Sequence, residues 1–122
     1  MERTESACRV WWDEDVQIAH ADWQHGAVCD LAAAQTVSAE LMALGQGRVP
    51  VLVDMRGLAK FERAAREHFI ADDKGARAVA LLVGSAVSKM IANFFIGMKR
   101  LPVPIQMFTD PIEAVDWLEK QP

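Results

Sequence analysis

An acid, an arginine and a glycine follow one of the most apolar stretches of the chain. Residues 51–57 read VLVDMRG, so Asp54 and Arg56 stand where a buried strand would end and a loop would begin. Ligands of open α/β sheets bind at the carboxyl ends of the strands, which makes both side chains candidates for binding a ligand or partner. Alternatively, Asp54 caps the turn, Gly57 supplies a positive φ and Arg56 is solvated. We expect Asp54 and Arg56 to point to opposite faces of the strand, which argues against a direct ion pair.

A second candidate is the stretch VGSAVSK, residues 83–89, which leads into an expected helix. Free amides at a helix N-terminus can hold an anion, and the hydroxyls of Ser85 and Ser88 would add to them. The stretch has one glycine, and Lys89 stands at the wrong spacing for the phosphate-binding motif GxxxxGK[ST]. Alternatively, Ser85 is the N-cap of the helix, and Ser88 and Lys89 need no special role.

The histidines and cysteines show no spacing that supports catalysis or metal binding. Cys8 and Cys29 are isolated, without CxxC spacing, and we expect free thiols packed as small hydrophobic side chains. A triad could be written from His25, Asp54 and Ser85, but any sequence of this length permits one, and neither GxSxG nor HExxH occurs. We therefore expect no enzyme activity, no metal and no cofactor.

The helix expected over residues 87–98 is apolar around much of its circumference. Phe94, Phe95 and Met98 cannot all face one side, so the helix must be covered twice. One cover is the sheet, and the other is a second subunit, an apolar ligand or a neighbouring helix. Trp11, which stands near two further tryptophans, suits an interface or a pocket wall, although core packing is the alternative for at least one of the three.

Composition limits the classes of function. The chain has 122 residues, 52% of them hydrophobic and 25% charged, as in a single globular domain. Its net charge of −4 argues against general nucleic-acid binding, which needs a basic surface. No apolar stretch is long enough to cross a bilayer, and residues 1–10 lack the apolar core of a secretion signal. We expect a cytoplasmic protein without stable membrane insertion.

The elements that would position these residues alternate between strands and helices. The first are a hairpin over residues 8–19 with its turn at 13–15, a helix over 30–44, a strand over 48–54 and, after a short loop, a helix over 61–69. There follow a strand over 77–84, a helix over 87–98, a strand over 103–108 and a helix that begins at 109 or 110. This order, ββαβαβαβα, predicts one α/β domain over residues 1–122, with a mixed, mostly parallel sheet flanked by helices.

Three segments carry a family resemblance: VLVDMRGL, RAVALLVGSAVSKMIANFF and PIQMFTDPIEAVDWLEK. They resemble the STAS domain superfamily, and in particular its SpoIIAA-like and STAS-SEC14-like group. The closing segment matches that group at Phe108, Asp110, Glu113, Ala114, Trp117 and Leu118. The resemblance runs over the whole chain by element order and implies a SpoIIAA-like fold.

The resemblance also bears on function. In anti-anti-sigma STAS proteins, a serine or threonine after the third strand is phosphorylated, which switches binding to a kinase-type partner. The corresponding stretch here, residues 54–65, contains neither residue type. The resemblance therefore implies a binding module rather than a phosphorylation switch.

Two functions follow as hypotheses. The first is a non-catalytic regulatory module that acts through protein association, as a homodimer or with a regulatory protein partner. The second is a carrier of a small apolar or lipid-like ligand, because SEC14-like relatives are associated with lipid binding. The apolar helix over residues 87–98 would then line a cavity beside Asp54, Arg56 and Ser85. The candidate residues for ligand or partner binding are Asp54, Arg56, Ser85, Phe94, Phe95, Met98 and Trp11.

Overall fold

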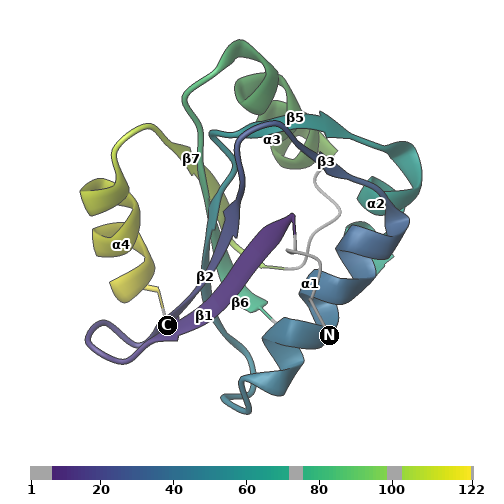
Figure 1. The fold of residues 1–122 in the computed structure, drawn as a ribbon. Coiled ribbons are helices and arrows are strands. Elements are labelled where there is room, and N and C mark those ends of the chain that lie inside the picture. Colours follow the sequence, from purple (N-terminus) through teal and green to yellow (C-terminus); the bar gives the residue numbers. More distant parts are fainter. Residues whose placement is uncertain (1–6, 72–75, 99–102, 122) are drawn as a thin grey trace.

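A computed structural model of the protein describes residues 7–71, 76–98 and 103–121, except for the side chain of Met98. The elements, in chain order, are β1 (Cys8–Asp13), β2 (Ile18–Trp23), β3 (Ala27–Cys29), α1 (Leu31–Ala43), β4 (Val49–Asp54), β5 (Leu58–Phe61), α2 (Arg63–Ala71), β6 (Ala76–Leu82), α3 (Ala86–Met98), β7 (Ile105–Phe108) and α4 (Pro111–Glu119). Figure 1 shows their arrangement.

Five strands form the main sheet, in the order β1-β2-β4-β6-β7. β1 and β2 form an antiparallel hairpin, and every other neighbouring pair in this sheet is parallel. Each parallel neighbour is reached through a connection that contains a helix, as parallel pairing requires. The predicted α/β class with a mixed, mostly parallel sheet is confirmed.

Helices cover both faces of the main sheet. Helix α4 packs on β4, β6 and β7 from one side, and α1, α2 and α3 lie on the other (Figure 1). Ala80 and Leu82 of β6 pack with Leu118 of α4, whereas Leu81 between them belongs to the core under α1 and α3. Because successive strand residues point to opposite faces, a strand that is apolar throughout is buried on both.

Short polar residues and a glycine set the helix ends. The side chain of Asp30 accepts a hydrogen bond from the amide of Ala33 at 2.8 Å and begins α1. Gly45, just beyond α1, has a φ of +72°, which glycine adopts without strain. Asp110 caps α4 through the amide of Ile112 at 2.9 Å.

Two short strands depart from the predicted order. β3 and β5 pair in parallel as a separate two-stranded sheet, and β5 occupies residues expected in the loop and at the helix start. Helix α2 therefore begins at Arg63 and not at Phe61. Strands of three and four residues are too short to show an alternating pattern, and their partners lie about thirty positions apart in the sequence.

The first hairpin also differs in its turn. The turn covers residues 14–17, so Val16 lies outside the strand, and Gln17 has a φ of +58°. β2 continues to Trp23, beyond the predicted end of the hairpin at residue 19, so His20 lies within this strand.

Candidate functional site

An apolar cavity of about 150 Å³ lies between the main sheet and the helices on its α1 side. Its floor is formed by Val51 and Val53 of β4, Val79 and Leu81 of β6, and Ile105 of β7. These are alternate residues of neighbouring parallel strands, so their side chains rise from one face of the sheet. The floor is entirely hydrocarbon.

Helix α1 forms one wall and the entrance of the cavity. Val37 and Leu41 line it from the inward face of the helix, and Val37 is buried. Met42 also lines the cavity, yet 63% of its surface is exposed. The cavity therefore reaches the surface beside Met42, near the C-terminal end of α1.

Three aromatic rings form the opposite wall. The ring of Phe61 meets that of Phe69 edge-on at 5.9 Å between centroids, and that of Phe95 at 5.2 Å. Phe95, one of the candidate residues, is only 7% exposed and points inward from α3. Contacts between aromatic rings are directional, so this wall has a defined shape.

Ser38 is the one hydroxyl-bearing residue among those that line the cavity. It lies on α1, and its Oγ is 2.9 Å from Nε2 of His68 on α2. The other lining side chain with a polar hydrogen is the indole of Trp23. The interior is thus apolar, with one hydroxyl and one indole N–H in its walls.

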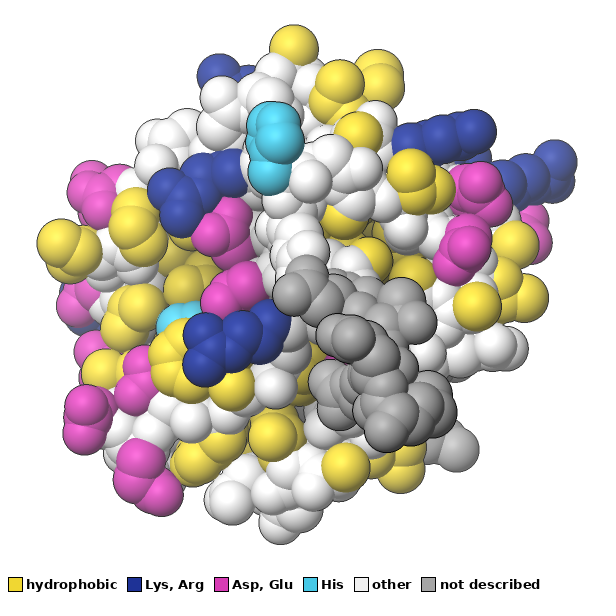
Figure 2. Space-filling model, viewed as in Figure 1, with side chains coloured by type: hydrophobic (Ala, Val, Ile, Leu, Met, Phe, Trp, Pro, Cys, Tyr) yellow, Lys and Arg dark blue, Asp and Glu magenta, His cyan; other side chains and the backbone are white. Residues whose placement is uncertain are grey.

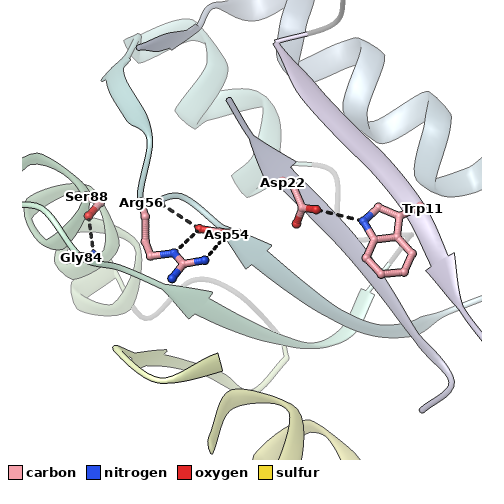
Figure 3. Close-up of polar contacts among 6 residues, drawn as sticks. All are labelled: Trp11, Asp22, Asp54, Arg56, Gly84 and Ser88. Carbon is pink, nitrogen blue, oxygen red and sulfur yellow. Dashed lines mark hydrogen bonds and ion pairs between the residues drawn. The ribbon is translucent and has the colours of Figure 1, made fainter. Parts of the chain in front are cut away.

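Asp54 and Arg56 form a direct ion pair at the carboxyl end of β4 (Figure 3). Nε of Arg56 is 3.0 Å from Oδ1 of Asp54, and Nη2 is 2.8 Å from Oδ2. These hydrogen bonds raise the pKa of Arg56. The expectation of opposite faces was wrong, because strand residues two apart share a face and because β4 ends at Asp54. The two charges neutralise each other.

Gly57 is required for a close backbone approach and not for a positive φ. A Cβ at this position would lie 2.7 Å from Cα of His25 and 2.9 Å from the carbonyl oxygen of Gln24. The carbonyl of Gly57 also accepts a hydrogen bond from the amide of Gly26 at 2.7 Å. The expectation that Gly57 supplies a positive φ was wrong; it brings this loop against the loop after β2.

Ser85 and Ser88 bond to each other at the start of α3. Oγ of Ser85 accepts from the amide of Ser88 at 3.0 Å, which confirms Ser85 as the N-cap. Oγ of Ser88 accepts in turn from the amide of Gly84 at 3.1 Å (Figure 3). It also accepts from the amide of Ser85 at 2.9 Å. Ser88 is fully buried and holds the loop closed, so the expectation that it needs no special role was wrong. These three amides are not free for an anion.

Trp11 lies on β1 within a stack of side chains on the α4 side of the sheet. Its ring lies parallel to that of His20 at 3.9 Å, and the guanidinium of Arg9 lies 5.2 Å from the ring centroid. Its indole nitrogen donates to Asp22 at 3.0 Å (Figure 3). His20 in turn contacts Asp13 at 3.1 Å. Trp11 therefore packs locally and lies apart from the cavity.

Phe94, a further candidate residue, lies on the exposed side of α3. Phe94 is 42% exposed, and the guanidinium of Arg66 lies 4.8 Å from the centroid of its ring. Phe94 is exposed and Phe95 is buried, so the two do not share one face of the helix, as the sequence predicts, although their rings meet edge-on at 5.8 Å between centroids. The side chain of Met98 lies outside the described part of the structure.

The two thiols are buried and free, as predicted. Burial, reinforced by Asp22, raises the pKa of Cys8, and burial, reinforced by Asp30, raises the pKa of Cys29 to about 12. Both therefore stay protonated at neutral pH, which makes them poor nucleophiles.

Some kinds of site are absent from the described residues. Over residues 7–71, 76–98 and 103–121, no group of three or more His, Cys, Asp or Glu side chains could hold a metal ion. None of the helices in these ranges has the length and apolar character to cross a membrane. Acidic and basic side chains are interspersed on the face drawn in Figure 2, without a continuous basic area.

The sequence matches one family model, Domain of unknown function (DUF7793), over residues 10–121. The chain belongs to the DUF7793 family. The matched range includes the cavity, the Asp54–Arg56 pair and the Ser85–Ser88 loop. No curated protein matches the chain.

Two solved structures are similar to this DUF7793 chain. One is an uncharacterized DUF3478-family protein from Shewanella loihica PV-4 with a SpoIIAA-like fold; identity is 18%, the TM-score is 0.61, and the match covers 97% of this chain and 98% of that one. The other, a protein of unknown function from Arthrobacter sp. FB24, is 30% identical with a TM-score of 0.35, over 97% of this chain and 96% of that one. The first likeness supports the predicted SpoIIAA-like fold.

The sequence predicts a cavity lined by the helix over residues 87–98, beside Asp54, Arg56 and Ser85. In this DUF7793 chain Phe95 of that helix does line the cavity, but none of those three residues does, so the predicted position was wrong. The sequence does not single out Ser38, and His68 shows no spacing that supports catalysis; the structure brings the two side chains within 2.9 Å. The helical spacing of Val37 and Leu41 predicts that they face inward, but no local pattern signals an unfilled volume, and the place of Ser38 in its wall depends on how α1 packs.

Proposed function

We propose that this protein binds a small apolar ligand in the cavity and does not change it chemically. The cavity itself carries the proposal, with a volume of about 150 Å³ and walls of aliphatic and aromatic side chains. An engineered cavity of roughly 150 Å³ lined by Leu, Ile and Phe stays dry and binds benzene. Volume and wall chemistry together favour a ligand of that size and polarity.

The volume also favours a class of ligand. Pockets that bury drug-sized molecules measure roughly 300–1,000 Å³. This cavity is smaller, which favours a single ring or a chain of about six carbons over a complete membrane lipid. The opening beside Met42 gives such a molecule a way in.

The positions of the polar groups support binding without catalysis. Ser38 lies inside α1, where backbone amides bond to carbonyls of the same helix, so they are not available to stabilise an oxyanion beside its hydroxyl. Asp54 and Arg56 bind each other. Cys8 and Cys29 are buried thiols with raised pKa values.

Calorimetric titration with benzene tests the proposal. We expect saturable one-to-one binding with a Kd on the order of 1 mM or tighter. This affinity is within the maximum binding free energy of a ligand with six carbon atoms. Val79→Phe should fill the cavity from its floor and abolish binding while the protein stays folded. Val28→Phe, the same substitution at a residue that is 43% exposed, is the matched control and should bind normally. No saturable heat with the wild type, or equal binding by both variants, would contradict the proposal.

A second function, association with another copy of the chain, is favoured by the outer face of α3. Val87, Met90 and Phe94 are 37%, 66% and 42% exposed, and their spacing places them on one side of the helix. A two-fold axis would set this stripe against its copy. Stable interfaces bury about 800 Å² on each partner, and a stripe of three side chains offers less area than this. We therefore expect a weak dimer that forms only at high protein concentration.

Light scattering across a concentration series tests this association. The wild type should rise toward a dimer mass, and Met90→Glu should remain monomeric. Ile112→Glu, which removes an apolar side chain that is 78% exposed on α4, is the control and should dimerise like the wild type. A wild type that stays monomeric at millimolar concentration would rule out the dimer.

A further inference from the structure

We infer that the cavity selects ligands that carry one uncharged hydroxyl group, which hydrogen-bonds to Ser38. The inference rests on the proposed function and specifies the class of ligand: a phenol or a small cyclic alcohol rather than a pure hydrocarbon. Ser38 lies between Val37 and Leu41 in the cavity wall, and it brings a hydroxyl group to a wall of apolar side chains.

The hydroxyl of Ser38 has hydrogen-bonding capacity beyond its bond to His68. A serine hydroxyl offers one donor and two acceptor lone pairs, and the 2.9 Å contact with Nε2 of His68 uses one of these. Within the described part of the chain, Ser38 makes no other side-chain hydrogen bond that would use the rest.

The unused hydrogen-bonding capacity of Ser38 suits a ligand hydroxyl whichever ring nitrogen of His68 carries the proton. If Ser38 donates to Nε2, its lone pairs accept a hydrogen bond from the ligand O–H. If Nε2–H donates to Ser38, the serine proton points elsewhere and donates to the ligand oxygen. A hydroxyl is both donor and acceptor, so it satisfies both arrangements, whereas a carbonyl satisfies only the second.

The rest of the cavity excludes charge and limits size. The lining residues include no Asp, Glu, Lys, Arg or His, so a carboxylate or ammonium would lose its hydration without an opposite charge in contact. The volume of about 150 Å³ holds one six-membered ring. A molecule with one ring and one hydroxyl group fills this volume and forms a hydrogen bond with Ser38.

A purely structural role for Ser38 makes a different prediction. Its bond to His68 joins α1 to α2, so removal of the hydroxyl would lower the stability of the protein whatever ligand it binds. A role in selection changes the ratio of two affinities instead. The pair phenol and benzene isolates that ratio, because the two molecules differ by one hydroxyl.

The test is a calorimetric titration of the full chain with benzene and with phenol, for the wild type, Ser38→Ala, Ser38→Thr and Thr36→Ala. In the wild type, phenol should bind at least as tightly as benzene, although phenol is the better hydrated of the two. Ser38→Ala should weaken phenol roughly three- to tenfold, the usual value of one hydrogen bond, and leave benzene within about twofold. Ser38→Thr retains the hydroxyl and should restore phenol binding.

Thr36→Ala is the matched control, since Thr36 lies on the same helix and its hydroxyl bonds to the carbonyl of Ala32 at 2.9 Å. It should change neither affinity. Benzene binding by Ser38→Ala shows that this variant is folded with its cavity intact. The inference is overturned, with the proposed function intact, if benzene binds and phenol does not, or if Ser38→Ala weakens both equally. Failure of both ligands to bind the wild type overturns the inference and the proposed function together.

Discussion

The guanidinium of Arg56 binds both carboxylate oxygens of Asp54, at 3.0 Å and 2.8 Å. The amide of Arg56 donates to the same carboxylate at 3.1 Å, so backbone and side chain bind one partner. The pair shapes the turn after β4 and leaves little free charge there. We propose that a ligand binds instead in the cavity between the sheet and α1, α2 and α3.

Removal of the ion pair should have a small effect on stability. The side chain of Arg56 is 50% exposed, and exposed pairs contribute about 0.2–1 kcal/mol. A double-mutant cycle with Asp54→Ala and Arg56→Ala should give a coupling free energy in this range that falls as salt is added. A coupling of several kcal/mol, or one that salt leaves unchanged, would show that the pair is more deeply desolvated than its exposure indicates.

Gly57→Ala should destabilise the fold by about 1–3 kcal/mol in urea denaturation, because the new methyl group meets backbone atoms of His25 that cannot rotate away. Gly97→Ala is the matched control. A Cβ there has no heavy atom within 4 Å, and alanine in a helix should stabilise the protein by about 0.5–1 kcal/mol. Equal effects of the two substitutions would contradict the close approach of the two loops.

Ser88→Ala should cost about 1–3 kcal/mol of unfolding free energy. It leaves the amides of Gly84 and Ser85 without the acceptor that they share, in a place that water does not reach. Ser85→Ala removes the N-cap and should cost about 1 kcal/mol. Thermal or urea unfolding gives both values. A neutral Ser88→Ala would mean that other acceptors reach these amides.

Stability should fall as the pH rises above about 9. The unfolded thiols ionise near their ordinary pKa of 9.0, whereas burial raises the pKa of Cys29 to about 12 in the folded protein and that of Cys8 as well. The raised pKa values therefore contribute stability that is complete below pH 9 and is lost progressively above it. The slope should approach about 1.4 kcal/mol per pH unit for each thiol.

Urea denaturation between pH 7 and 11 measures this slope, with Cys29→Ala as the comparison. The variant should lose less stability per pH unit than the wild type, because one ionisable thiol is missing from its unfolded state. Identical slopes would show that the Cys29 thiol ionises equally easily in both states, and therefore that it is not buried.

Features that depend on a few adjacent residues could be predicted from the sequence. Asp30 and Asp110 cap their helices because a short polar side chain reaches an amide two or three residues ahead. The apolar run of β6 predicts burial on both faces, which α4 on one side and α1 and α3 on the other provide. The order of these elements is sufficient to predict the α/β class.

Features that depend on contacts between distant parts of the sequence could not be predicted. Leu58 of β5 finds its partner Ala27 across thirty residues, and nothing local marks either segment as a strand. The approach of Gly57 to His25 joins the same two loops. The cavity is still harder to predict, because it is a volume that side chains from eight elements leave unfilled. It depends on packing and not on any motif.

Diffraction from crystals of the protein under xenon pressure tests the central claim most directly, because xenon enters dry apolar cavities of this size. The account predicts xenon between Val79 of the floor and Phe95 of the wall, and none at this place in Val79→Phe. A wild-type cavity filled by repacked side chains or by a chain of ordered water molecules, with no xenon, would contradict it.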